Sequence, residues 1–237
     1  MIKVAVLGYG TVGSGVVEVI ESNNAQVSKK ACDEMHVKYI LDLRDFPGDP
    51  YEDRVIHDFN VILEDPEISI VCEVMGGVGA AYQFTKACLE KGKSVCTSNK
   101  ELVAKHGPEL LALAKANDCN YLFEASVGGG IPIIRPLNSA LTAEKIEAVF
   151  GIVNGTTNYM LTKMEREGAD YKEVLKQAQA LGYAEANPTA DVEGHDACRK
   201  LAILLSLVTG KNVASEDIQT EGITTVTAAD FAYAKAA

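Results

Sequence analysis

Charged side chains that could act on a substrate gather in one short stretch of the sequence, EANPTADVEGHDACRK, which runs from Glu185 to Lys200. An apolar helical pattern, LAILLSLVTGK, follows it directly. Asp196 and Lys200 are four residues apart, so on a helix they share a face beside that apolar stripe. A lysine at the edge of a core is partly desolvated and is a usable proton donor. The nearby carboxylates of Glu185, Asp191 and Asp196 could hold a cationic group of a substrate.

The same spacing also suits a capped helix with an intrahelical ion pair between Asp196 and Lys200 and no chemical role. The residue pattern leaves both interpretations open. His195 stands next to Asp196, but adjacent helix residues do not face each other, so a paired base and acid is not favoured there.

The elements that must position such residues begin with KVAVLG at residues 3–8, an unbroken run typical of a buried parallel strand. Strands and helices then alternate as far as residue 125. The pattern predicts strands over Val37–Leu43, Ile68–Glu73, Ser94–Thr97 and Asn120–Ala125, and helices over Thr11–Glu21, Ala80–Glu90 and from Gly107 to about Asn117. This alternation predicts an α/β fold whose first domain, residues 1–127, is a doubly wound, Rossmann-type parallel sheet.

The character of the chain changes near Gly128, where VGGGIPII is too rich in glycine for a strand interior. Beyond it we expect a helix to about Leu141, then a long strand over Lys145–Val153 and a GTTN turn at residues 155–158. Three further helices are expected over Tyr159–Glu167, over Tyr171–Leu181 and from about Asp191. We therefore expect an α+β domain over residues 128–237 that binds substrate and dimerises. The chain ends in a helical pattern, which suggests that this domain is incomplete.

A glycine motif lies between the first strand and the first helix, where Gly8, Gly10 and Gly13 fit the pattern GxGxxG with Thr11 and Val12. The motif alone is weak, but a strand before it and a helix after it are the context of a dinucleotide site. Gly8 allows the tight turn, Gly10 lets the backbone approach a pyrophosphate, and Gly13 lets the helix pack on the strand. The alternative is a glycine turn that binds no ligand.

The choice between NAD and NADP depends on the residues after the second strand, Asp42-Leu43-Arg44-Asp45. A carboxylate there binds the ribose 2′-hydroxyl of NAD, and an arginine accepts the 2′-phosphate of NADP. Both types are present, so NAD, NADP or both are permitted. The interpretation leans to NADP through Arg44.

Composition narrows the class of partner. The 237 residues carry a net charge of −11, which argues against nucleic acid or an anionic membrane as the main partner. No apolar run is long enough to cross a membrane, and no signal peptide is evident. The six cysteines form no CxxC pair, a pattern typical of reduced thiols in a cytoplasmic protein.

The segment AQALGYAEANPTADVEGHDACRK closely resembles the signature of the homoserine dehydrogenase family, with Ala178, Gly182, Asn187-Pro188, Asp191, Gly194, Asp196 and Lys200 in its fixed positions. The glycine loop and the segments SNKELVAKHG, EASVGGGIPII and GIVNGTTNYML are similar to the same family. The resemblance covers essentially the whole chain. Family members usually continue well beyond this chain's end.

The resemblance implies reversible, NAD(P)-dependent reduction of L-aspartate 4-semialdehyde to L-homoserine, in the biosynthesis of threonine, methionine and isoleucine. It implies that Lys200 is the proton donor, that Lys100 is a second catalytic lysine at the boundary of cofactor and substrate, and that Ser98 and Lys100 bind the cofactor. Glu185, Asp191, Asp196, Gly182 and Tyr183 would bind the substrate. Backbone carbonyls of Glu124, Val127, Gly129 and Ile131 would bind a monovalent cation such as sodium. From the residues alone, the loop after Glu124 could equally be a glycine-rich connector that binds no cation. Lys100 could equally be a solvent-exposed lysine at a helix start.

Two other functions compete with this hypothesis. Cys96 superficially resembles the nucleophile of a cysteine-dependent semialdehyde dehydrogenase, although its alternation with Val95 and Thr97 favours a buried strand residue. A module that only senses NAD(H) would need the glycine loop but not Lys100, Glu185, Asp191 and Lys200 together. Their joint presence favours catalysis. The apolar strand expected over Lys145–Val153 would expose a sheet edge, so we expect a homodimer through the region after Gly128.

Overall fold

A computed structural model describes residues 1–236, and the chain divides into two compact units, Met1–Arg135 and Pro136 onward. The sequence placed this division after Val127. The carboxylate of Glu124 accepts hydrogen bonds from the backbone N–H groups of Ile133, Ile134 and Arg135, at 2.7, 2.9 and 2.7 Å. These bonds tie the glycine-rich loop to the first unit.

The first unit contains a six-stranded sheet of the predicted class. Its strands are β1 Ile2–Leu7, β2 Met35–Leu41, β3 Val55–Ile56, β4 Ile68–Glu73, β5 Ser94–Thr97 and β6 Tyr121–Leu122. They lie in the order β3-β2-β1-β4-β5-β6, and every pair is parallel. The order reverses between β1 and β4, so this is the doubly wound Rossmann-type sheet that the alternation predicts.

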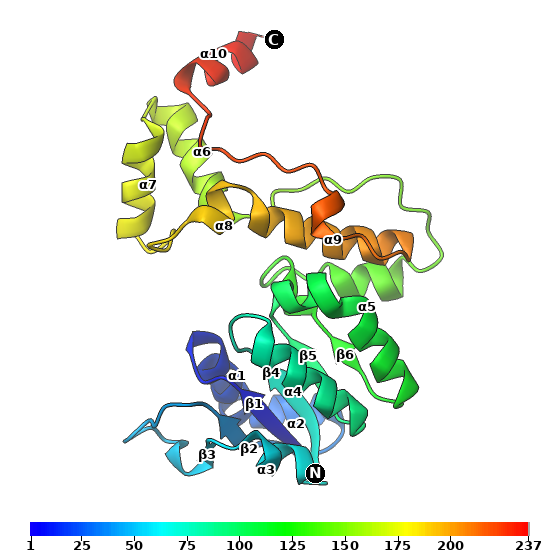
Figure 1. Cartoon of the computed structure of the whole chain (residues 1–237). Helices are drawn as coiled ribbons and strands as arrows, with labels where there is room; N and C mark the ends of the chain where they lie inside the picture. Colours follow the sequence, from blue (N-terminus) through cyan, green and yellow to red (C-terminus); the bar gives the residue numbers. More distant parts are fainter. Residues whose placement is uncertain (237) are drawn as a thin grey trace. The chain divides into compact units, whose positions relative to one another are not determined.

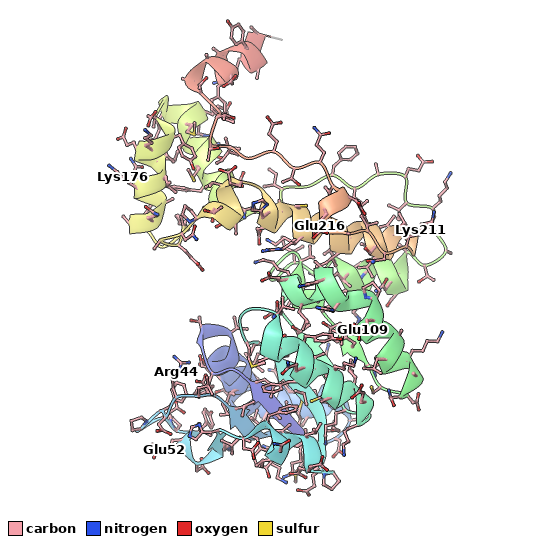
Figure 2. The ribbon with its side chains drawn as sticks, viewed as in Figure 1. Arg44, Glu52, Glu109, Lys176, Lys211 and Glu216 are labelled. Atoms are coloured by element: carbon pink, nitrogen blue, oxygen red, sulfur yellow. The ribbon has the colours of Figure 1, made fainter. Side chains whose placement is uncertain are left out.

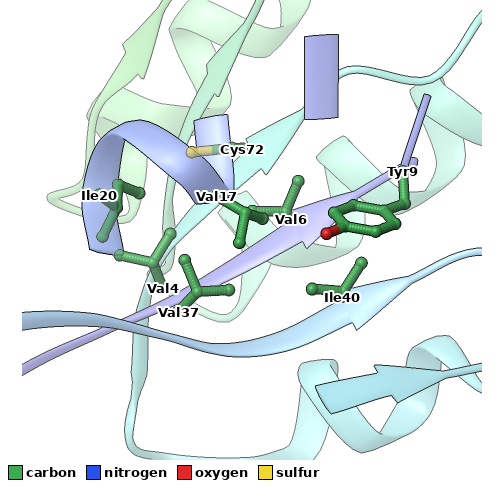
Figure 3. Close-up of a cluster of buried hydrophobic side chains, with 8 residues drawn as sticks. All are labelled: Val4, Val6, Tyr9, Val17, Ile20, Val37, Ile40 and Cys72. Carbon is green, nitrogen blue, oxygen red and sulfur yellow. The ribbon is translucent and has the colours of Figure 1, made fainter. Parts of the chain in front are cut away.

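Five helices flank this sheet: α1 Thr11–Ser22, α2 Asn24–Ala31, α3 Phe59–Glu64, α4 Gly79–Glu90 and α5 Lys100–Ala116. Two short 3₁₀ helices, η1 Glu52–Arg54 and η2 Glu124–Ser126, complete the unit. In Figure 1, α1 and α2 lie on one face of the sheet and α4 and α5 on the other. Apolar side chains fill the space between β1, β2, β4 and α1, and Figure 3 shows them: Val4, Val6, Tyr9, Val17, Ile20, Val37, Ile40 and Cys72. Each large side chain of this core contributes about 1.5–3 kcal/mol by its burial.

The helix α5 begins earlier than the sequence predicts, at Lys100 and not at Gly107. The side-chain oxygen of Asn99 accepts a hydrogen bond from the N–H of Leu102 at 3.0 Å, which is a standard helix N-cap. Pro108, expected at the first turn, therefore lies inside the helix, where it donates no backbone hydrogen bond. The strand expected over Asn120–Ala125 is also shorter and consists of Tyr121–Leu122.

The second unit consists of helices and irregular segments over residues 136–236. They are the π-helical turn η3 Pro136–Ala140, α6 Gly155–Glu167, α7 Tyr171–Ala180, α8 Thr189–Val192, α9 His195–Thr209, η4 Ser215–Asp217 and α10 Ala228–Ala236. Its core joins α6, α7 and α8 through Met160, Met164, Val174, Ala178, Ala184 and Val192. The helix expected from about Asp191 is in fact two helices, α8 and α9.

The strand predicted over Lys145–Val153 is wrong for this chain, because the segment is irregular. Phe150 is 93% exposed and Ile152 is 79% exposed. A strand needs a neighbour for its backbone N–H and C=O groups, and no segment within residues 136–236 pairs with this one. The GTTN turn is also wrong. Asn154 caps α6 there by accepting the N–H of Thr157 at 2.8 Å.

None of the helices formed within residues 1–236 is long and apolar enough to cross a membrane.

Candidate functional site

The turn after β1 has the geometry of a phosphate-binding glycine loop. Gly8 has φ +97°, a conformation that favours glycine. A Cβ on Gly13 would lie 1.9 Å from the carbonyl oxygen of Gly8, so α1 passes directly over the turn. A Cβ on Gly10 would meet nothing within 4 Å, and α1 begins at Thr11 with no side-chain cap. The open space and the helix N-terminus suit a pyrophosphate.

Asp42 and Arg44, the two candidate ribose contacts, form one ion pair at the end of β2. Both carboxylate oxygens of Asp42 accept hydrogen bonds from the Arg44 guanidinium at 3.0 Å, and one of them also accepts the N–H of Tyr9 at 2.8 Å. The Arg44 guanidinium is the largest cause that holds the pKa of Asp42 well below its usual value. Arg44 itself is 63% exposed and projects from the surface of the first unit (Figure 2). The guanidinium also donates to the backbone oxygen of Tyr9 at 3.3 Å, so it is held beside the glycine turn.

A cavity of about 580 Å³ lies along this edge of the sheet. The residues that follow β1, β2 and β4 line it, together with Phe59 and Phe84, whose rings stack at 4.0 Å between centroids. The cavity therefore spans the carboxyl ends of the strands where the strand order reverses. Open α/β sheets bind ligands at this position, and the volume suits part of a dinucleotide.

Ser98 and Lys100 lie at the same edge of the sheet, between β5 and α5. Ser98 is half-buried in the connecting loop, and Lys100 is the first residue of α5. The sequence analysis missed Glu73, a completely buried carboxylate that ends β4. The one feature of the sequence that could have indicated Glu73 is its position as an acidic residue at the end of the apolar run ISIVC.

Cys96 lies within β5, and its sulfur is 3.2 Å from the sulfur of Cys72 on β4. The thiol therefore belongs to a strand interior and not to a helix N-terminus. This position does not support the cysteine-dependent alternative.

In the second unit, the ammonium of Lys200 is held between two acceptors. Nζ donates to Oδ2 of Asp196 at 2.7 Å and to the backbone oxygen of Val153 at 2.6 Å. The Asp196 side chain is 5% exposed and that of Lys200 is 17% exposed. The helical spacing thus does produce the intrahelical ion pair. It is nearly buried, and it also receives contacts from outside the helix.

Asn154 is the residue that joins this pair to Asp191, and the sequence analysis missed it. Its Nδ2 donates to Oδ1 of Asp191 at 2.7 Å and to Oδ2 of Asp196 at 3.0 Å. Its Oδ1 caps α6, so the amide has one orientation, with both N–H groups toward the carboxylates. Two acids, an amide and a lysine from α6, α8 and α9 therefore form one hydrogen-bonded cluster.

Three other predicted substrate residues lie outside this cluster. Glu185 is exposed, and the contact recorded for it is a hydrogen bond from Gln179 to its backbone oxygen at 3.1 Å. Gly182 follows α7 with φ +77°. Tyr183 is 57% exposed, and its backbone oxygen accepts a hydrogen bond from Thr156 at 2.6 Å. The structure brings Asp191, Asp196 and Lys200 together, but not Glu185.

The predicted cation loop is tightly folded. Although burial raises the pKa of Glu124, the three backbone N–H groups that its side chain accepts lower it below the usual value. Gly128 and Gly129 both have positive φ, at +86° and +57°. The N–H of Ile131 donates to the oxygen of Gly128 at 3.0 Å, and the N–H of Val127 donates weakly to the oxygen of Glu124 at 3.4 Å. No cluster of three or more acidic, histidine or cysteine side chains suited to a metal occurs within residues 1–236.

Two family models match the chain. Residues 8–124 match "Homoserine dehydrogenase, NAD binding domain", and residues 132–237 match "Homoserine dehydrogenase". The homoserine dehydrogenase of Bacillus subtilis is 45% identical over 99% of this chain and 55% of its own length. That of Synechocystis is 44% identical over 98% of this chain and 54% of its own length. The chain thus spans about half the length of the curated relatives that it matches.

Solved structures that resemble this chain are also homoserine dehydrogenases. A homoserine dehydrogenase from Thiobacillus denitrificans is 41% identical with a TM-score of 0.92, and the match covers 99% of this chain and 55% of that one. A hyperthermophilic archaeal homoserine dehydrogenase mutant in complex with NADPH is 30% identical with a TM-score of 0.84, over 97% of this chain and 76% of that one. With a glycine loop in the first unit and the Lys200 cluster in the second, this chain belongs to the homoserine dehydrogenase family.

Proposed function

We propose that this chain is the cofactor- and substrate-binding part of an NAD(P)-dependent homoserine dehydrogenase. The Lys200–Asp196–Asn154–Asp191 cluster carries the proposal, because a module that only senses a nucleotide has no use for it. The cofactor supplies hydride to the aldehyde carbon of aspartate semialdehyde. The Lys200 ammonium stabilises the developing alkoxide and protonates it, and the carboxylates hold the substrate's α-ammonium group.

The direct test is an assay of the full-length protein with homoserine and either NADP or NAD, followed by the absorbance of the reduced nicotinamide. We expect turnover with at least one cofactor. Absence of turnover with both, in a folded protein that binds the reduced cofactor, would reject the proposed reaction and leave a binding module.

We propose that NADP is the preferred cofactor, because the exposed guanidinium of Arg44 stands at the end of β2 beside the cavity. Arg44→Ala should weaken NADP binding by about 1.5–3 kcal/mol, the contribution of a charge-assisted hydrogen bond, and weaken NAD binding much less. Calorimetric titration of both cofactors measures the difference. Arg54→Ala is the control, because Arg54 pairs with Glu21 away from the cavity. Equal losses for NADP and NAD would contradict the assignment.

We propose that Asp191 and Glu185 bind the substrate's ammonium group. Asp191→Ala and Glu185→Ala should each raise KM for homoserine far more than KM for the cofactor, because both residues lie in the second unit. Steady-state kinetics with each substrate varied in turn would show this. Glu173→Ala removes an exposed carboxylate from the first turn of α7 and serves as the control. If both variants keep wild-type homoserine kinetics, neither carboxylate binds the substrate, and Asp191 has a structural role in the cluster.

Two further proposals concern a bound cation and the location of the protein. The backbone carbonyls of Glu124, Val127, Gly129 and Ile131 would bind a monovalent cation such as sodium, which replacement of sodium by a large organic cation in the assay would test. Six free thiols are typical of a reducing compartment, so we propose a cytoplasmic location, which fractionation would test.

We also propose a homodimer. The apolar side chains of Phe150 and Ile152 are exposed on a segment with no partner strand among the described residues, and a second copy would cover them. Sedimentation of the full-length protein at micromolar concentration should give a dimer. A monomer would reject this proposal.

A further inference from the structure

A charged side chain that the proposed chemistry does not use lies inside the first unit. Glu73 ends β4 and has 0% of its surface exposed. Its carboxylate accepts two hydrogen bonds, from the N–H of Met75 at 2.8 Å and from the hydroxyl of Thr97 at 2.6 Å. Burial raises the pKa of Glu73. Burying a carboxylate costs several kcal/mol unless it is well paired, and these two donors, together with the Asn99 side chain, which also lowers the pKa of Glu73, offset that cost.

The two donors lie at the carboxyl ends of two adjacent strands. Met75 belongs to the loop after β4, and Thr97 is the last residue of β5. Thr97 and Glu73 are direct neighbours in the sheet. The carboxylate therefore fixes the point where the chain leaves the sheet after β4 and after β5.

Asn99 closes the network between the same two loops. Its N–H donates to the hydroxyl oxygen of Thr97 at 2.9 Å, and its Nδ2 donates to the backbone oxygen of Gly77 at 2.6 Å. Its Oδ1 caps α5 through Leu102. These hydrogen bonds run from Glu73 through Thr97 and Asn99 to Gly77, and they join the loop after β4, the loop after β5 and the start of α5 at Lys100.

A dinucleotide bound at this edge of the sheet would place its second half on these loops. In a doubly wound sheet the cofactor extends across the point where the strand order reverses, with one mononucleotide on each half. The ribose-binding pair Asp42–Arg44 is at the end of β2, which assigns the adenosine half to β1, β2 and β3. The nicotinamide half then falls on the loops after β4 and β5.

We propose that Glu73 is a positioning residue for the nicotinamide half of the cofactor and acts through Thr97 and Asn99. It touches neither cofactor nor substrate. It holds two loops and the N-terminus of α5 in the arrangement that receives the nicotinamide. The inference requires that the first unit binds NAD(P), as its family does, but it does not depend on homoserine as the substrate.

The test compares two threonine-to-valine variants of the full-length protein. Thr97→Val removes the hydroxyl that links Glu73 to Asn99. Thr85→Val removes a buried hydroxyl on α4 that has no hydrogen-bond partner in the described part of the chain, so it is a matched control. Calorimetry would measure binding of NADPH and of adenosine 2′,5′-bisphosphate, which lacks the nicotinamide. If the protein prefers NAD, the pair is NADH and ADP-ribose.

We expect Thr97→Val to weaken binding of the reduced cofactor about tenfold, as the loss of one hydrogen bond of about 1.4 kcal/mol implies, and to leave the adenosine fragment within twofold. Thr85→Val should change neither. Glu73→Gln, which keeps the shape but removes the charge, should give the same pattern as Thr97→Val and carries the test if that variant does not fold.

Equal weakening of cofactor and fragment would overturn the proposal, because it would show a general structural role. Unchanged cofactor binding in both Thr97→Val and Glu73→Gln would overturn it as well. A protein that shows the expected binding pattern but does not oxidise homoserine would refute the proposed reaction and leave this inference standing.

Discussion

Replacing Lys200 by alanine is expected to lower kcat by about 10²–10⁴, the usual contribution of a positioned general acid–base. This corresponds to about 3–5.5 kcal/mol of transition-state stabilisation. In the reducing direction the ammonium donates a proton as hydride reaches the aldehyde carbon, and in the oxidising direction the neutral amine accepts the hydroxyl proton of homoserine. Cofactor binding should change little, because the glycine loop lies in the other unit.

The structure adds a stability effect that must be separated from the catalytic one. Lys200 neutralises Asp196, whose side chain is 5% exposed, and its removal takes away the positive charge while the Asn154 amide still donates to the carboxylate. Breaking a nearly buried pair costs about 3 kcal/mol, which thermal unfolding would detect. The double variant Lys200→Ala with Asp196→Asn removes the stranded charge. It should recover much of the Tm but none of the kcat.

Two further variants complete this test. Lys200→Arg should not restore activity, because a guanidinium stays protonated at any working pH. Lys163→Ala breaks an exposed i,i+4 pair with Glu167 in the same unit and should leave both kcat and Tm nearly unchanged. Near-normal kcat in Lys200→Ala would move the proton role to Lys100. A variant that cannot fold even with Asp196→Asn would show that Lys200 is structural.

The central strands of the first unit could be predicted from the sequence, because a buried parallel strand is a short apolar run with clear ends, whereas the two-residue edge strand β3 was missed and β2 begins two residues earlier than predicted. Ile68–Glu73 and Ser94–Thr97 form strands at the predicted residues. The start of α5 was missed because Pro108 is a strong local signal for a first helical turn. Asn99 is a weaker signal in the sequence, but its side chain caps the helix in the structure, so α5 begins at Lys100.

The second unit was harder to predict because its elements depend on partners that the pattern does not reveal. The residues of Lys145–Val153 have strand character, yet a strand forms only where another strand pairs with it. GTTN reads as a turn by composition, but Asn154 is an N-cap and the helix begins at Gly155.

In the candidate site, too, features that are local in the sequence could be predicted and contacts between distant elements could not. The glycine loop and the Asp196–Lys200 pair are local in sequence and were predicted. Asn154 and Glu73 were missed, because their partners lie on other elements: Asn154 bonds Asp191 and Asp196 across α6, α8 and α9, and Glu73 bonds Thr97 across two strands. Only tertiary structure distinguishes these residues from an ordinary asparagine and an ordinary strand-end glutamate.

A single methyl group on Gly13 is expected to damage the cofactor site severely. The added Cβ would lie 1.9 Å from the carbonyl oxygen of Gly8 and 2.9 Å from its carbonyl carbon, both backbone atoms that cannot rotate away. Either α1 moves off the sheet or the turn at Gly8 opens. Such overpacking costs about 3 kcal/mol of folding stability. Both movements also displace the helix N-terminus from the pyrophosphate, so Kd for NADP and for NAD should each rise about 10²-fold, or about 2.7 kcal/mol.

Gly15→Ala is the matched control, because Gly15 lies on the same helix and its added Cβ would meet nothing within 4 Å. Alanine is a better helix former than glycine, so this variant should gain about 0.5–1 kcal/mol in stability and keep its cofactor affinity. Denaturant unfolding and calorimetric titration of the two variants give both quantities. If Gly13→Ala binds the cofactor as Gly15→Ala does, the close approach of α1 to the turn is not what forms the phosphate site. If both variants lose stability equally, the helix tolerates no alanine in this turn, and the clash at Gly8 is not the cause.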